Sequence, residues 1–176
     1  MNKIHRTKNI LLIIGGSVAV IIGFAGFAKY LQYREANLPG ILAAEQGKNH
    51  IEVGATHEAY STNPPTSGPH YAEAAEWGVY KEPLPDEQLI HNLEHGGVWI
   101  SYRPGISKDI IQKLESMVSI FGSKVIVTPR PENDADIALA VWGRYDTFSV
   151  SEYSDERIEE FIKLLKNKTA PEPFAP

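Results

Sequence analysis

Residues 86–102 read DEQLIHNLEHGGVWISY, and this stretch decides the fold because it joins a helix to a buried strand. Apolar side chains recur at helical spacing along its first half: Leu89, Ile90 and Leu93. Asp86 is the expected N-cap of this helix, and Gly96 suits a left-handed C-terminal cap. Residues 97–102 are a largely apolar run that predicts a buried strand, which ends before Pro104 and Gly105.

The histidines of this helix carry the sharpest chemical signal in the chain. His91 and His95 lie four residues apart, so both imidazoles share one helix face and can bind the same metal ion. A third histidine, His70, follows Gly68 and Pro69 in the polar and aromatic loop of residues 63–71. Three neutral imidazoles are a sufficient ligand set for zinc or copper. The alternative is that they only hydrogen-bond the loop to the helix and bind no metal.

Glu94 lies between the two helical histidines and has three possible roles. It can accept a hydrogen bond from a histidine N–H, join the ligand set, or pair with a donor from the loop. Residues 91–95 also match the H-x-x-E-H pattern of inverted zinc proteases, in which this glutamate is the general base. Those enzymes resemble one another over far larger domains and use a distant glutamate ligand, so proteolysis is the weaker reading.

The other histidines and the tryptophans are weaker candidates. His50 and His57 lie in linker-like surroundings, and His5 falls on the far side of the predicted membrane segment. Trp99 and Trp142 sit in apolar strand patterns, so both are expected in the core rather than at a ligand site.

Composition excludes several classes of protein. The chain has 176 residues, of which 43% are hydrophobic and 10% aromatic, enough for one domain with a real core. The net charge of -5 and the lack of a basic stripe argue against nucleic-acid binding. Cysteine is absent, so a metal has only histidine, carboxylate or methionine ligands available.

The N-terminus predicts a membrane anchor. Residues 1–8 are basic, and the apolar run of residues 9–30 is long enough to cross a bilayer as a helix. The positive-inside tendency places residues 1–8 in the cytoplasm and everything after the anchor outside it. The alternative is a signal peptide cleaved after residues 26–28, which also exports the domain.

The rest of the chain predicts a mixed α+β domain. Residues 31–49 are expected to be a linker, residues 50–170 the extracytoplasmic domain, and residues 171–176 an extended tail. Strands are expected at residues 97–102, 124–128, 136–142 and 147–150, and helices begin after the caps Ser107 and Ser154. This order predicts a small sheet of about four strands covered by helices, with a parallel crossover joining the first two strands.

Three segments resemble a known family. They are residues 60–71 (YSTNPPTSGPHY), residues 91–97 (HNLEHGG) and residues 140–144 (AVWGR), where the family usually has Ala in place of Val141. They resemble the bacterial and archaeal family catalogued as domain of unknown function 3105, over roughly residues 50–173. Members typically have one N-terminal membrane segment and one small domain, so the resemblance implies an extracytoplasmic architecture and no particular reaction.

Three functional hypotheses follow. The first is a single-pass cell-membrane protein whose outer domain binds copper or zinc through His70, His91 and His95, with Glu94 completing or tuning the site. The second is a metal-free interaction or structural module of the cell envelope. The third is a small zinc metallohydrolase. No catalytic residue and no organic cofactor site is assigned, and no protein partner is identified.

Overall fold

A computed structural model describes residues 20–33 and 35–175. The chain divides between Leu38 and Pro39 into two units. Within the described residues, no helix combines the length and the apolar character needed to span a membrane. The predicted cytoplasmic segment, residues 1–8, lies outside the described residues, and so does the first part of the predicted anchor, residues 9–19.

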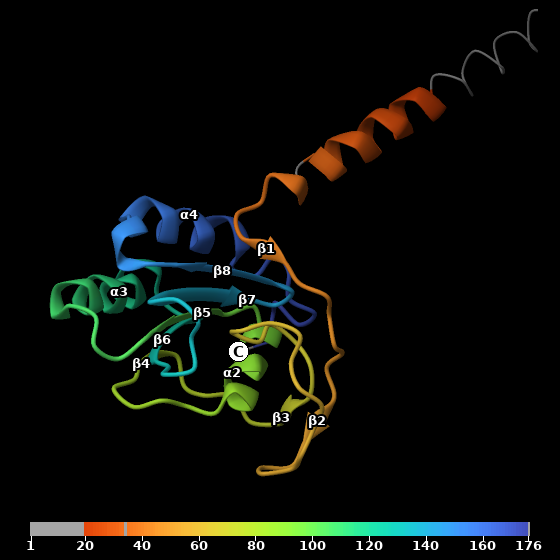
Figure 1. Cartoon of the computed structure of the whole chain (residues 1–176). Helices are drawn as coiled ribbons and strands as arrows, with labels where there is room; N and C mark the ends of the chain where they lie inside the picture. The colour runs from red at the N-terminus through yellow and green to blue at the C-terminus, as the bar shows by residue number, and fades with distance from the viewer. Residues whose placement is uncertain (1–19, 34, 176) are drawn as a thin grey trace, which may run out of the picture. The chain divides into compact units, whose positions relative to one another are not determined.

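The C-terminal unit is built on a six-stranded mixed sheet (Figure 1). Its strand order is β1 (Ile41–Leu42), β8 (Arg144–Phe148), β7 (Ile137–Val141), β5 (Val98–Tyr102), β6 (Val125–Pro129) and β4 (Gly78–Val79). The four long strands, β5 to β8, are the four that the sequence predicted. The two extra strands contain two residues each, too few to show an alternating pattern. The mixed α+β class is therefore confirmed, with a larger sheet than expected.

The predicted crossover is present. β5 and β6 pair in parallel, and α3 (Lys108–Phe121) connects them. The side chain of Ser107 caps α3 by accepting a hydrogen bond from the Ile110 amide, and Gly122 ends the helix with a φ of 68°. β7 then returns antiparallel to β5, and β8 pairs antiparallel with β7.

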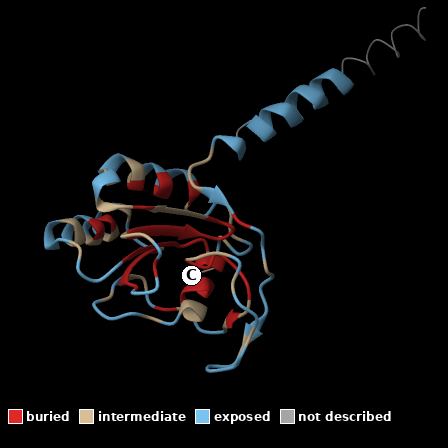
Figure 2. Ribbon diagram, viewed as in Figure 1, coloured by how far each residue is buried: buried red, intermediate tan, exposed pale blue. Residues whose placement is uncertain are grey.

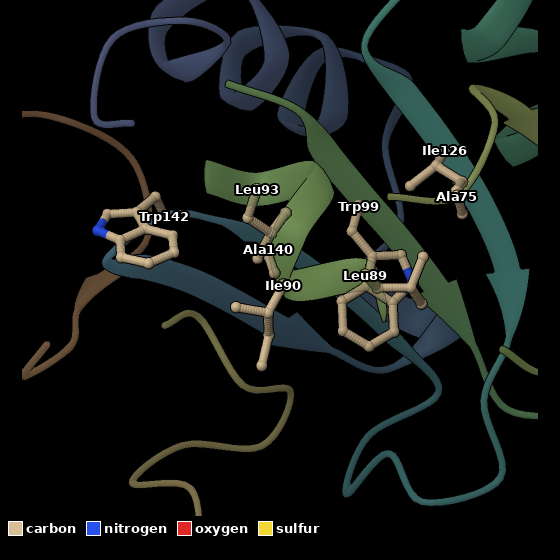
Figure 3. Close-up of a cluster of buried hydrophobic side chains, with 8 residues drawn as sticks. All are labelled: Ala75, Leu89, Ile90, Leu93, Trp99, Ile126, Ala140 and Trp142. Carbon is tan, nitrogen blue, oxygen red and sulfur yellow. The ribbon is translucent and has the colours of Figure 1, made fainter. Parts of the chain in front are cut away.

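Helices cover both faces of the sheet (Figure 1). Trp99, Ile126 and Ala140 lie opposite one another in register, so they share one face of the sheet. Figure 3 shows these side chains packed against α2 (Asp86–Glu94), through Leu89, Ile90 and Leu93, together with Ala75 and Trp142. On the other face, α3 and α4 (Asp155–Leu165) contribute Leu114, Met117, Ile158, Phe161, Ile162 and Leu165 to the core.

The burial pattern matches this layering (Figure 2). β5, β6 and β7 are buried along their whole length, whereas the outer faces of α3 and α4 are exposed. Trp99 and Trp142 are 1% and 2% exposed, which confirms both as core residues. The 3-10 helix η1 (Val150–Glu152) ends β8 early, so this strand covers residues 144–148 instead of the expected 147–150.

A second, smaller sheet stands beside α2. β2 (His50–Ile51) pairs in parallel with β3 (His70–Tyr71), and His50 lies directly opposite His70. This pairing brings together two segments that are separated in sequence by residues 52–69.

Candidate metal centre

The C-terminal half of α2 supplies the helical side chains of the site. Gly96, with a φ of 88°, ends the helix in the left-handed conformation expected of it. The Gly97 amide donates to the Asn92 carbonyl at 2.9 Å, and the Gly96 amide donates to the Leu93 carbonyl at 3.0 Å. These two bonds form a Schellman motif, so the last turn that carries His91 and Glu94 is held in a defined geometry.

The polar loop runs beside residues 46–50 and delivers His70 to the helix. The Gly68 amide donates to the Gly47 carbonyl at 2.9 Å, and the His70 amide donates to the Asn49 carbonyl at 3.0 Å. The Ser67 hydroxyl accepts a hydrogen bond from the Gln46 amide. The backbone of the loop therefore positions His50 and His70 side by side.

Four side chains converge at this point: His50, His70, His91 and Glu94. Each offers one ligand atom, and these atoms all lie within 4.8 Å of one another. Nε2 of His70 is 3.0 Å from Oε2 of Glu94, and Nε2 of His50 is 3.7 Å from the same oxygen. The rings of His50 and His91 are nearly parallel, with centroids 5.2 Å apart, and the ring of His70 is perpendicular to both.

Backbone contacts determine which nitrogen of His70 faces the cluster. Its Nδ1 is 2.8 Å from the carbonyl oxygen of Gly68, which can only accept, so Nδ1 carries the hydrogen. In the neutral ring, Nε2 then presents a lone pair to the Glu94 carboxylate at 3.0 Å. Two acceptors this close need either a metal ion or a hydrogen between them.

His91 is arranged in the same way. Its Nδ1 donates to the carbonyl oxygen of Tyr71 at 2.7 Å, so Nε2 is left with its lone pair. Burial is the largest influence on the pKa of His91 and lowers it, against the opposing effect of the hydrogen bond to Tyr71. His91 is therefore neutral near pH 7, as a metal ligand must be.

The cluster is buried on one side and open on the other. His70, His91 and Glu94 are 0%, 6% and 3% exposed, whereas the side chain of His50 is 52% exposed. On the open side, Nζ of Lys48 lies 3.7 Å from Oε1 of Glu94 and 2.9 Å from Oε1 of Glu172. The ion pair with Glu172, followed by the charge of Glu94, raises the pKa of Lys48.

The structure brings together three of the four predicted ligands. His95 is outside the converging group, although its Nε2 lies 3.0 Å from Nε2 of His91. His50, expected to be a weaker candidate, takes part. The geometry also groups Glu94 with the ligand atoms, whereas the H-x-x-E-H reading needs zinc on His91 and His95 with Glu94 as a separate base.

Several supporting residues were not predicted. The side chain of Asn92 forms two hydrogen bonds with the backbone of Ala75, at 2.9 and 2.8 Å. Asp86 does not cap α2, because Arg130 holds its carboxylate through two hydrogen bonds of 2.8 and 2.7 Å. Lys48 lies in the segment predicted to be a linker. The sequence contains only one signal for these residues, namely that Asn92 directly follows His91.

The fold and the site define a small α+β domain with a buried histidine and carboxylate cluster at the end of one helix. Residues 52–176 match the model of the family described as protein of unknown function DUF3105, so the chain belongs to that family. No curated protein and no solved structure matches the chain. His70, His91 and Glu94 lie within the matched residues, and His50 lies just before them.

Proposed function

We propose that this domain binds one divalent transition-metal ion through His50, His70, His91 and Glu94. The observation that carries the proposal is the pair formed by His70 and Glu94. Its two facing acceptor atoms lie in a buried site, and two further imidazoles converge on it. A bound cation would satisfy both acceptors, and the backbone contacts of His70 and His91 orient both rings for coordination.

The donor set favours zinc or copper(II). Three imidazole nitrogens and one carboxylate oxygen suit a four-coordinate zinc site, and imidazole also binds copper(II) well. Copper(I) prefers sulfur ligands, and Met117, one of the two methionines, is buried in α3 away from the cluster. His95 lies outside the converging group, with its Nε2 3.0 Å from Nε2 of His91.

Metal content tests this proposal directly. The full chain, purified without chelator, is expected to contain near-stoichiometric zinc or copper by elemental analysis. His91→Ala is expected to lose the metal, whereas His57→Ala is the matched control and keeps it. His57 lies outside the cluster and pairs with Glu87 at 3.1 Å. If neither metal binds the parent chain even after reconstitution with zinc and copper(II), the proposal fails and the histidines only brace the loop.

We also propose that the domain lies outside the cytoplasm, anchored to the cell membrane by residues 9–30. The basic residues Lys3, Arg6 and Lys8 before an uncharged apolar run support this orientation. A reporter enzyme that is active only outside the cytoplasm, fused after residue 176, is expected to be active. If instead only a reporter that works in the cytoplasm is active at the same position, the orientation is the reverse of the proposed one.

A further inference from the structure

A cavity lies next to the cluster of His50, His70, His91 and Glu94 and shares only His50 with it. It has a volume of about 700 Å³ and is lined by residues 50–53, residues 71–73, Pro85 and Gln88. β2 and β3 end at residues 51 and 71, so the two chain segments that continue from them form its walls. Its volume is within the range of ordinary ligand sites, roughly 300 to 1,000 Å³.

The lining combines apolar and acidic groups. Ile51, Val53 and Tyr71 provide apolar contact, and Val53 is 83% exposed. Glu52 and Glu73 are both exposed, and neither carboxylate has a hydrogen bond or an ion pair with any described residue. No lysine or arginine lines this groove. The groove therefore presents two free negative charges on an apolar surface, which is complementary to a positively charged ligand with apolar neighbours.

The form of the groove favours a polypeptide over a small molecule. Small ligands are normally enclosed over 70–90% of their surface, as a general rule. Here Glu52, Val53, Ala72 and Glu73 are all exposed, so the walls leave one side open. An extended peptide gains its affinity from several contacts along an open groove and needs no such enclosure.

We propose that this groove docks an extended segment of a partner protein that alternates lysine or arginine with apolar residues. The basic side chains pair with Glu52 and Glu73, and the apolar side chains pack on Ile51 and Val53. The groove shares only His50 with the metal cluster, so docking does not require the metal.

Fluorescence anisotropy of a neutral-labelled (Lys-Val)₃ peptide with the full chain tests the docking. Saturable binding is expected, and (Gln-Val)₃ should bind at least about tenfold more weakly. The double variant Glu52→Gln, Glu73→Gln should weaken binding about three- to tenfold, and added salt should weaken it in the parent. The matched control, Glu58→Gln with Glu76→Gln, neutralises two exposed carboxylates outside the groove and should have no effect.

Several outcomes would overturn the inference. One is that peptide binding does not saturate at about 1 mM peptide. Another is that the two double variants lose equal peptide affinity. A third is that NMR amide chemical shifts change on peptide addition away from residues 51–53 and 71–73. Full displacement of the peptide by n-butylammonium at the same concentration would instead identify a site for small amines. The titration is repeated in chelator, where binding should persist. Failure of metal binding and failure of peptide docking are therefore distinguishable.

Discussion

The two ends of α2 solve the problem of buried polar groups in opposite ways. At the start of the helix, Arg130 is 6% exposed and pairs with both carboxylate oxygens of Asp86. It also donates to the side-chain oxygens of Asn63 and Asn133. The positive guanidinium therefore faces the negative carboxylate, and each of these acceptor oxygens receives a hydrogen bond. At the other end, lone pairs of His70 and Glu94 face each other, and their only cationic neighbour within 4 Å among the described residues is the exposed Lys48.

The same loop, residues 63–71, reaches both ends, because Asn63 contacts Arg130 and His70 contacts Glu94. The network at the start of α2 is complete within the protein, whereas the cluster at its end leaves His70 and Glu94 facing each other, where the metal ion proposed above would satisfy both. We therefore expect the first to contribute to stability whether or not metal is present, and the second, on the proposed function, to contribute according to the metal concentration.

The largest expected effect is at the Arg130 end. Arg130→Met leaves the Asp86 carboxylate, 25% exposed, without its partner, and breaking a largely buried ion pair in this way costs about 3 kcal/mol. We expect this loss in denaturant unfolding whether or not metal is present. Lys81→Met removes a surface ion pair and serves as the control, with little change expected. If the loss of unfolding free energy in Arg130→Met depends on metal, the two ends of α2 do not act independently.

The next effect is at the metal end. A ligand present at a hundred times its Kd stabilises the folded state by about 2.7 kcal/mol, and chelation removes that gain. Thermal unfolding of the parent should therefore respond to chelator, and so should Arg130→Met. His91→Ala should give the same curve with and without chelator. If the parent is also insensitive, the cluster does not depend on a cation.

Lys48 sharpens the comparison, because its charge competes with a metal ion for Glu94. Lys48→Met is expected to tighten metal binding about two- to fivefold, with a smaller difference at high salt. The measurement is a competition titration with a chromophoric chelator. Lys163→Met, which removes a surface pair on α4, is the control and should leave the affinity unchanged. Weaker binding in Lys48→Met would mean that Lys48 supports the site.

The smallest effect concerns His57, which pairs with Glu87 in the first turn of α2. The hydrogen bond to Glu87, followed by that to the Glu58 carbonyl, raises the pKa of His57 above 6.5. The protonated form is stabilised by folding, so the contribution is full below about pH 6.5 and is lost as pH rises through the folded-state pKa. The parent should exceed His57→Gln in unfolding free energy at about pH 5.5, and the difference should shrink at about pH 8.5. A constant difference would rule out the titration.

Local sequence patterns determined most of the framework. The apolar periods of residues 86–102 and of the segments around Ser107 and Ser154 predicted α2 to α4, and four strands followed from short apolar runs. These predictions succeeded because helix and strand periods, caps and glycines act within a few residues. The same locality explains why His91 and Glu94 could be assigned together, since one helical turn separates them.

Only the tertiary structure decided what completes the site. His50 reaches the cluster through a two-residue parallel pairing with His70, which leaves no periodic signal in the sequence. His91 and His95 share a helix face, yet the convergence point lies on the side of Glu94, because the loop carries His70 there. Asp86 was expected to cap α2, but it binds Arg130 instead. Arg130 is 44 residues away in sequence, and only the folded sheet brings the two side chains together.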